Sequence, residues 1–169
     1  MEKLVKLGLV RSIGLSNFNS EQITDILKRG SIKPVTNQVE CHPYLGQEKL
    51  LQFCSARDIK LTAYSPLGSP ARPWTKPGER ELLQEPELKM IGEKHGKSPA
   101  QVLIRWQIQR GLVVIPKSGN PARIKENGDV FDFELDEDDM KQIASYECNG
   151  RIMSPWDSRH PHYPFNIEF

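Results

Sequence analysis

Two cations and a predicted helix start lie close together within residues 111–127, and residues of these types bind anions. Asn120 has the side chain of a helix N-cap, and Pro121 suits the first helical position, where no amide donor is needed. Arg123 would then lie in the first turn of a helix, where the positive end of the dipole disfavours a cation. Lys117 adds a second positive charge before the helix. Two cations beside free backbone amides favour a bound phosphate, and a solvated surface Lys and Arg is the alternative interpretation of this segment.

Four strands that alternate with helices would position this segment. Short runs rich in β-branched residues predict strands at 12–15, 34–40, 59–64 and 112–115, the last a buried strand ended by Pro116. Apolar residues at helical spacing predict helices over 2–9, from a cap at Ser20, at about 48–57, near 86–94 and 99–109, from Pro121, and at about 137–146. This alternation predicts parallel strands joined by right-handed crossovers.

Polar side chains follow each predicted strand and would meet on one face. They are Ser16 and Asn17, Gln38 and Glu40, Tyr64 and Ser65, and Lys117 and Ser118. The carboxyl ends of parallel strands lie on the same side of a sheet, where open α/β sheets and barrels bind their ligands. A phosphate site after the last strand is typical of barrels. Four strands do not close a barrel, which needs about eight, so two strand edges would stay open.

Composition indicates an ordinary globular protein. The 169 residues fit one domain, 27% of them are charged, and the net charge is +1. Lys and Arg mixed with acidic residues argue against a nucleic-acid partner. Cys41, Cys54 and Cys148 are odd in number and lack metal-ligand spacing, so reduced thiols in a cytoplasmic protein are expected. No signal peptide is recognised after Met1, and no apolar run approaches the ~20 residues of a membrane span.

Several motifs, in order along the chain, resemble those of the aldo-keto reductases. They are residues 12–18 (SIGLSNF), 37–44 (NQVECHPY), 63–68 (AYSPLG) and 115–118 (IPKS), and the tail 163–165 (YPF) resembles the aldose and aldehyde reductase branch. The resemblance covers essentially all 169 residues and implies the C-terminal half of a (β/α)8 TIM barrel, strands five to eight. On this resemblance, residues 1–169 form a single partial domain whose N-terminal half is missing, and Met1 is similar to an internal methionine of the family.

The resemblance also implies an activity, the NADPH-dependent reduction of aldehydes and ketones to alcohols. The family's catalytic Asp, Tyr, Lys and His lie in the missing half, so we expect no catalytic residue here and negligible activity of the isolated chain. The family places Tyr64 on the nicotinamide ring, Ser16, Asn17 and Gln38 on its carboxamide, Ser65, Leu67 and Ser69 along the pyrophosphate, Pro116, Lys117, Ser118 and Arg123 around the 2′-phosphate, and Glu126 and Asn127 near the adenine. The substrate residues that it implies are Trp74, Met153 and Pro155.

Ordinary structural alternatives exist for these assignments. Tyr64 could be a half-buried core aromatic. Gln38 and Asn37 could bond the neighbouring backbone at a strand end, and Glu126 and Asn127 could form an exposed helix face. His42 is interpreted mainly as a packing residue, and no metal site is expected. Three functions stay open: a reductase fragment, an NADP-binding module without chemistry, and an interaction protein that self-associates through the edges of the half-barrel.

Overall fold

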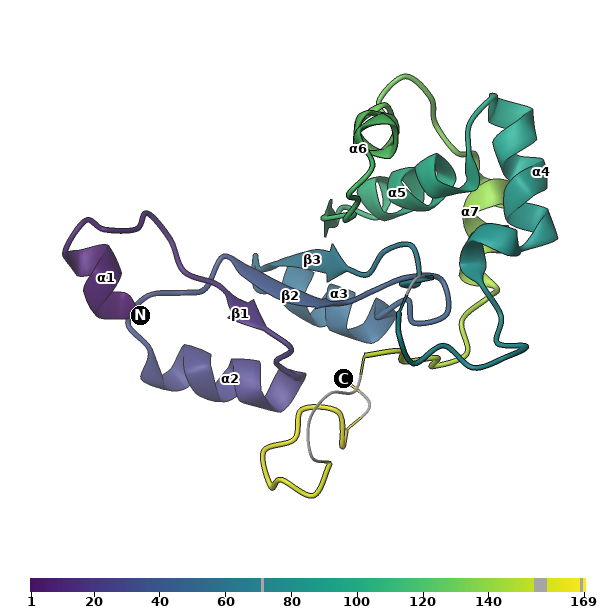
Figure 1. Ribbon diagram of the computed structural model, residues 1–169. Coiled ribbons are helices and arrows are strands. Elements are labelled where there is room, and N and C mark those ends of the chain that lie inside the picture. The colour runs from purple at the N-terminus through teal and green to yellow at the C-terminus, as the bar shows by residue number, and fades with distance from the viewer. Residues whose placement is uncertain (71, 154–157, 168) are drawn as a thin grey trace. The chain divides into compact units, whose positions relative to one another are not determined.

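A computed structural model describes residues 1–70, 72–153, 158–167 and 169 of this chain. The helices are α1 (Glu2–Lys6), α2 (Ser20–Arg29), α3 (Glu48–Ser55), α4 (Pro86–His95), α5 (Pro99–Gln109), α6 (Pro121–Gly128) and α7 (Glu137–Ala144), with a short 3-10 turn η1 (Leu82–Gln84) (Figure 1). The strands are β1 (Leu15–Ser16), β2 (Thr36–Glu40), β3 (Lys60–Tyr64) and β4 (Val113–Val114). All the predicted helices and strands are therefore present, with ends that differ by a few residues.

The four strands form one parallel sheet in the order β1-β2-β3-β4. β1 pairs with β2 in parallel, with Leu15 opposite Asn37 and Ser16 opposite Gln38. Each strand neighbours the one before it in the sequence, and each connection contains at least one helix. The predicted α/β fold class with parallel strands is confirmed.

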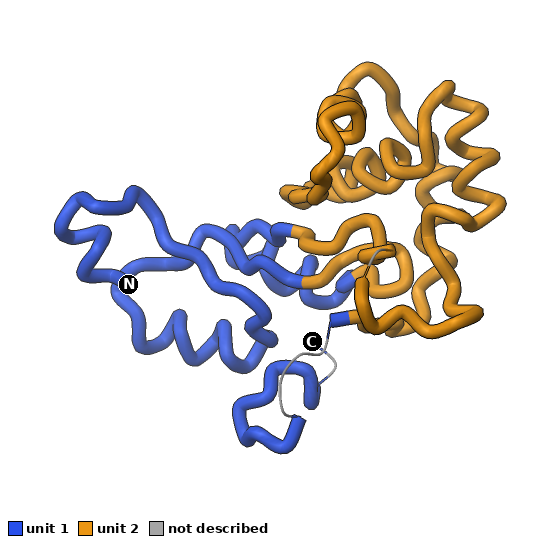
Figure 2. Tube along the Cα trace, in the orientation of Figure 1, with its two compact units in different colours: residues 1–39, 47–62, 153–169 blue, residues 40–46, 63–152 orange. Residues whose placement is uncertain are grey.

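The described residues divide into two compact units (Figure 2). Unit 1 comprises residues 1–39, 47–62 and 153–169, and it contains α1, α2 and α3. Unit 2 comprises residues 40–46 and 63–152, and it contains α4 to α7 together with β4. Strands β2 and β3 each begin in unit 1 and end in unit 2.

Helix α2 of unit 1 is capped by Asn19 and not by Ser20, which corrects the predicted start. Oδ1 of Asn19 accepts a hydrogen bond from the amide of Gln22 at 2.9 Å. In return, Oε1 of Gln22 accepts from the amide of Asn19 at 3.2 Å. Both Asn and Ser can cap a helix, and the Gln three residues after Asn19 decides between them by completing a capping box.

Helix α5 lies in the core of unit 2, and its residues 101–107 are all buried. Ser98 caps this helix in a second capping box, with Gln101 as the partner. Trp106 is only 2% exposed. The core cluster around it consists of Tyr44, Leu82, Leu88, Ile91, Val102, Leu103, Leu135 and Ile143. Pro86 and Pro99 occupy the first positions of α4 and α5, where no amide donor is required.

Strand β4 is less buried than predicted. Leu112, just before the strand, is 5% exposed, but Val113 is 50% exposed and Ile115 is 42% exposed. β4 is the terminal strand in the order of the sheet, so its side chains have a neighbouring strand on one side only. An apolar β-branched run therefore did not distinguish a buried central strand from an edge strand.

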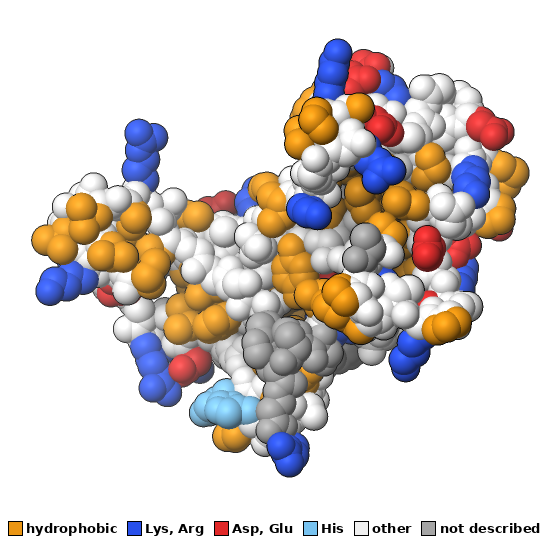
Figure 3. Space-filling view, viewed as in Figure 1, with side chains coloured by type: hydrophobic (Ala, Val, Ile, Leu, Met, Phe, Trp, Pro, Cys, Tyr) orange, Lys and Arg blue, Asp and Glu red, His pale blue; other side chains and the backbone are white. Residues whose placement is uncertain are grey.

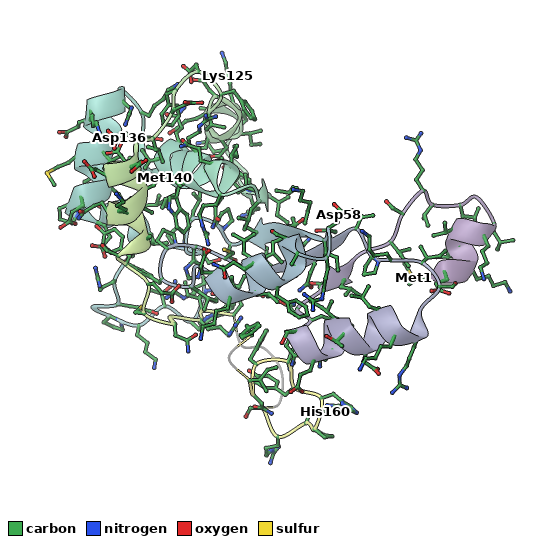
Figure 4. All side chains as sticks on the ribbon, turned by 180° about the vertical axis from the view of Figure 1, so that it is seen from behind. Met1, Asp58, Lys125, Asp136, Met140 and His160 are labelled. Atoms are coloured by element: carbon green, nitrogen blue, oxygen red, sulfur yellow. The ribbon has the colours of Figure 1, made fainter. Side chains whose placement is uncertain are left out.

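The acidic segment before α7 forms a helix cap whose strength depends on pH. Oδ1 of Asp136, which is labelled in Figure 4, accepts from the amides of Asp138 at 3.0 Å and Asp139 at 2.9 Å. The ammonium of Lys94 and these amides lower the pKa of the Asp136 carboxyl from its ordinary value of 3.8 to about 2. A carboxyl with a lowered pKa stabilises the fold fully above its unfolded pKa and loses that contribution as the pH falls toward the folded pKa.

We therefore expect the cap of α7 to weaken between about pH 4 and pH 2. The amide proton shifts of Asp138 and Asp139, followed by NMR, should titrate with a midpoint near pH 2. In Asp136→Asn the cap acceptor is kept and this titration should disappear, whereas Lys94→Met should raise the midpoint. A wild-type midpoint at the ordinary value of 3.8 would contradict the contribution of Lys94.

The three cysteines differ in exposure. Cys54 of unit 1 and Cys41 of unit 2 are buried free thiols, and Cys148 is exposed. Burial raises the pKa of the Cys54 thiol to about 11 and also raises the pKa of the Cys41 thiol.

No helix among residues 1–70, 72–153 and 158–167 is both long enough and apolar enough to cross a lipid bilayer.

Candidate functional site

The candidate residues belong to both units. Unit 1 contains Ser16, Asn17 and Gln38 of the predicted carboxamide set, together with Met153. Unit 2 contains Tyr64, Ser65, Leu67, Ser69, Pro116, Lys117, Ser118, Arg123, Glu126, Asn127 and Trp74. Ser16 ends β1, Gln38 lies within β2, Tyr64 ends β3, and Arg123, Glu126 and Asn127 lie on α6.

In unit 1, parallel pairing brings the three carboxamide candidates together. Ser16 lies opposite Gln38 in the sheet, and the amide of Asn17 donates to the carbonyl oxygen of Gln38 at 2.9 Å. Asn37 bonds the backbone, because its amide group donates to the carbonyl oxygen of Phe18 at 2.8 Å. The side chain of Gln38 has no such partner among the described residues. Asn37 therefore bonds the neighbouring backbone, as the alternative interpretation expected, and the Gln38 amide remains available to a ligand.

Three candidate residues have backbone conformations that side chains with a Cβ seldom adopt. The φ angles are 58° at Asn17, 50° at Ser65 and 46° at Ser69. In the described part of the chain, six residues other than glycine have positive φ, so half of them are candidate cofactor residues. Such conformations cost about 1–3 kcal/mol each and gather at functional sites. This observation is independent of the motifs that selected the three residues.

The turn after β3 presents two serine hydroxyls side by side. Oγ of Ser69 donates to Oγ of Ser65 at 2.8 Å, and the amide of Gly68 donates to the carbonyl oxygen of Ser65 at 2.9 Å. Leu67 is partly buried against the core cluster of unit 2. Tyr64, at the end of β3, is half-buried and leaves part of its surface exposed to solvent. Leu67 therefore attaches the turn to the core, while Ser65 and Ser69 are half-buried.

Strand pairing also brings the exits of β3 and β4 next to each other. The amide of Ile115 donates to the carbonyl oxygen of Ala63 at 3.2 Å. Tyr64 directly follows Ala63, and Lys117 follows Ile115 by two residues. Adjacent strands lie about 5 Å apart, so Tyr64 and Lys117 both lie at the carboxyl end of this strand pair. Tyr64 and the Lys117 loop thus belong to the same face of unit 2.

The start of α6 is capped by its own asparagine, which corrects one part of the predicted anion site. Oδ1 of Asn120 accepts from the amides of Ala122 at 2.9 Å and Arg123 at 3.4 Å. The amide of Asn120 donates to Oγ of Ser118 at 3.1 Å. These amides are therefore not free, because the N-cap side chain that marks the helix start also occupies them. An anion at this position would be held by side chains, assisted by the helix dipole.

Lys117 and Arg123 are exposed cations on either side of this cap. Among the residues that the structure describes, neither forms an ion pair or a side-chain hydrogen bond. Several other cations of unit 2 are paired: Lys94 with Asp136 and Lys97 with Asp132. Charges of both signs are mixed over the visible face in Figure 3, and no basic stripe covers it. Lys117 lies in the loop between β4 and α6, and Arg123 lies in the first turn of α6.

The adenine candidates differ from each other. A carboxylate oxygen of Glu126 accepts a short hydrogen bond from the Ser98 hydroxyl at the cap of α5. Glu126 therefore fastens α6 to α5 and is not part of an exposed helix face. Asn127 is half-buried, and its side chain has no partner within the described part of the chain. Of the two residues, Asn127 is the more available to a ligand.

The substrate candidates are located only in part. Trp74 is 54% exposed and belongs to unit 2. Met153 is half-buried and belongs to unit 1. Pro155 lies outside the described residues.

The structure adds a buried acid that the predictions did not assign. Glu40 is fully buried, and one of its carboxylate oxygens lies 2.8 Å from Nε2 of His42, which is also fully buried. The same oxygen accepts from the amide of Ile152 at 2.7 Å. His42 is therefore a core residue, as interpreted, but one whose partner is an acid. The link to Ile152 spans 112 residues and has no local sequence signal.

Comparison with known proteins identifies the relationship. Residues 1–147 match the model of the Aldo/keto reductase family. Curated relatives include Aldo-keto reductase family 1 member A1-A of Danio rerio, 54% identical, and Aldo-keto reductase family 1 member A1 of Gallus gallus and of Homo sapiens, 52% and 49% identical. Each alignment covers 98% of this chain and 54% of the relative.

The chain thus spans about half the length of the curated relatives it matches. The chain has four consecutive parallel strands with their helices and about half the length of its relatives, which is consistent with part of a (β/α)8 barrel. The predicted resemblance is confirmed, and the chain belongs to the aldo/keto reductase family.

Proposed function

We propose that this chain contributes the NADP(H)-binding residues of a carbonyl reductase that converts aldehydes and ketones to alcohols. The observation that carries the proposal is the pair Lys117 and Arg123, two exposed cations without an ion-pair partner in the described residues, on either side of the cap of α6. Membership of the family supports the same activity. Because the chain spans about half the length of its relatives, the activity is proposed for the whole reductase.

The groups around the start of α6 suit a phosphate monoester. The planar guanidinium of Arg123 can give two parallel hydrogen bonds to phosphate oxygens, and Lys117 supplies a point charge. The oxygen of the Ser118 hydroxyl accepts from the Asn120 amide, so its hydrogen is free to donate to the same phosphate. Pro116 sets the direction of the loop after β4. We assign this set to the 2′-phosphate of NADP(H), and Asn127 with Glu126 to the adenine side.

The remaining residues suit the other end of the dinucleotide. Gln38 has an unpartnered amide that matches the donor and acceptor of a carboxamide, next to Ser16 and Asn17. Tyr64 would lie flat against the nicotinamide ring and fix which face is presented to the substrate. We assign Ser65, Leu67 and Ser69 to the pyrophosphate.

When bound, the nicotinamide supplies the hydride, and the residues of this chain bind and orient it. By resemblance, the acid that protonates the new alcohol is a tyrosine in the half of the family barrel to which this chain has no counterpart. We therefore propose that the chain alone has negligible turnover. Trp74, Met153 and Pro155 are proposed to contact the carbonyl substrate. We also propose a cytoplasmic location, in keeping with the free thiols. Self-association is proposed through the exposed edges of the half-barrel.

Fluorescence titration of the chain with NADPH, together with a reductase assay on benzaldehyde, tests the proposal. We expect saturable binding of one NADPH per chain and no aldehyde reduction above the blank. A folded chain that shows no saturable binding of NADPH at millimolar concentration would overturn the assignment of Lys117 and Arg123. Reduction at the rate of an intact family member would overturn the assignment of the proton donor to the other half.

A further inference from the structure

The C-terminal segment of unit 1 is fastened to the first turn of α2. Nδ2 of Asn19 donates to the carbonyl oxygen of Pro164 at 3.0 Å. Nε2 of Gln22 donates to the carbonyl oxygen of His162 at 3.0 Å. The two bonds span 145 and 140 residues of sequence. His160, labelled in Figure 4, begins the segment that these side chains hold.

A third donor extends the attachment to residue 169. The hydroxyl of Ser20 donates to a main-chain oxygen of Phe169 at 2.7 Å. The ring of Phe169 packs edge-on against Phe53 of α3 with 6.3 Å between centroids. The guanidinium of Arg57 covers the ring of Phe53 at 3.6 Å. The segment thus has a polar attachment on α2 and an aromatic attachment on α3.

The same two amide side chains have two separate tasks. The oxygen atoms of Asn19 and Gln22 form the capping box of α2, and their NH₂ groups hold the C-terminal segment. A capping box alone requires only the oxygens, and Ser or Asp at the cap with Glu three residues later would serve as well. The amide nitrogens are therefore needed only for the attachment of His162 and Pro164.

We propose that Asn19, Ser20 and Gln22 form a clasp whose purpose is to order the C-terminal segment, and that they are positioning residues for substrate binding. The held segment follows directly after the part of the chain with the substrate candidates Met153 and Pro155. This second part of the inference rests on the proposed reductase function. The clasp holds residues that follow these candidates in the sequence, and its effect on substrate binding is part of the proposal.

Two isosteric substitutions separate the clasp from the helix cap. Asn19→Asp and Gln22→Glu keep every capping oxygen and remove both NH₂ donors, and each places a carboxylate oxygen against a carbonyl oxygen. The acids also lie at the N-terminus of α2, where the helix dipole favours them. The double variant should therefore keep α2 intact while it releases the segment. Gln142→Glu, at an exposed position of α7, is the control for the added charge.

Hydrogen exchange measured by mass spectrometry on the full chain tests the clasp. In the double variant, amides of residues 158–169 should exchange at least about tenfold faster than in wild type, while amides of α2 keep their wild-type rates. Ser20→Ala should raise the exchange of the same segment by a smaller factor, and Gln142→Glu should leave it unchanged. Unchanged exchange in the double variant, or equal loosening of α2 and the segment, would overturn the clasp.

Ligand titration tests the positioning role separately. With NADPH bound, the Kd of benzaldehyde should rise at least about threefold in the double variant, while the Kd of NADPH stays at the wild-type value. Faster exchange with an unchanged benzaldehyde Kd would overturn the positioning role and keep the clasp. Failure of wild type to bind NADPH would remove the proposed function and the positioning role with it, and the exchange result would still decide the clasp.

Discussion

Substitution of Arg123 by Ala should weaken the binding of NADPH by about 10- to 100-fold and leave the binding of NADH almost unchanged. The reason is that Arg123 is an exposed cation without a partner among the residues that the structure describes, so its proposed role is limited to the 2′-phosphate that only NADPH carries. A charge-assisted bidentate pair in a partly exposed site is worth about 1.5–3 kcal/mol, and each 1.4 kcal/mol is a factor of ten in Kd. Fluorescence titrations with both nucleotides measure the effect.

Two further variants sharpen this comparison. Arg123→Lys keeps the charge and loses the planar fork, so the NADPH affinity should lie between those of wild type and Arg123→Ala. Lys125→Ala removes an exposed cation two residues further along α6, and it should change neither Kd because residues i and i+2 of a helix do not face each other. Equal weakening of NADPH and NADH in Arg123→Ala would mean that Arg123 does not contact the 2′-phosphate.

Substitution of Trp106 by Ala should lower the free energy of unfolding of unit 2 by about 3–5 kcal/mol. Trp106 is 2% exposed within the core cluster of unit 2, and the guanidinium of Arg110 covers its ring at 4.2 Å. Removal of the indole leaves a cavity that the surrounding side chains fill only in part, and it removes the cation–π contact as well. Denaturant unfolding followed by far-UV circular dichroism measures the change.

Trp74 provides the matched control for this prediction. The same substitution at Trp74, which is 54% exposed, should change the free energy of unfolding by less than about 1 kcal/mol. It should also leave the NADPH Kd unchanged, because Trp74 is proposed to contact only the substrate. If Trp106→Ala cost no more than Trp74→Ala, the core of unit 2 would not be centred on α5 as described.

Local chemistry made several elements predictable from the sequence. Asn120 followed by Pro121, and the prolines at the starts of α4 and α5, marked helix starts that the structure contains at the same residues. The parallel order of the strands was also expected, whereas the register that places Ser16 opposite Gln38 was not predicted. These predictions depend on interactions within a few residues or on a rule about neighbouring strands. Short-range patterns of this kind carry enough information to locate the helices and strands.

Features that depend on distant partners could not be predicted in the same way. The exposure of Val113 and Ile115 depends on the position of β4 in the sheet and not on its composition. Glu40 accepts a bond from Ile152, and Gln22 donates to His162, across more than a hundred residues. The cap of α6 was predicted correctly, yet the occupation of its amides by Asn120 contradicts the free amides that the anion site was expected to offer.

The three thiols differ in burial, so their rates of chemical labelling can report the unfolding of each unit. Cys54 is buried in unit 1, Cys41 is buried in unit 2, and Cys148 is exposed. A thiol-reactive chromophore would label Cys148 at once, and it would reach the other two only when their units open. Raised pKa values keep the buried thiols protonated, which further slows labelling in the folded state. Peptide mapping of the labelled sites over time would therefore measure the opening rate of each unit. Equal rates would indicate one cooperative unfolding event, and different rates would indicate that the units open in succession.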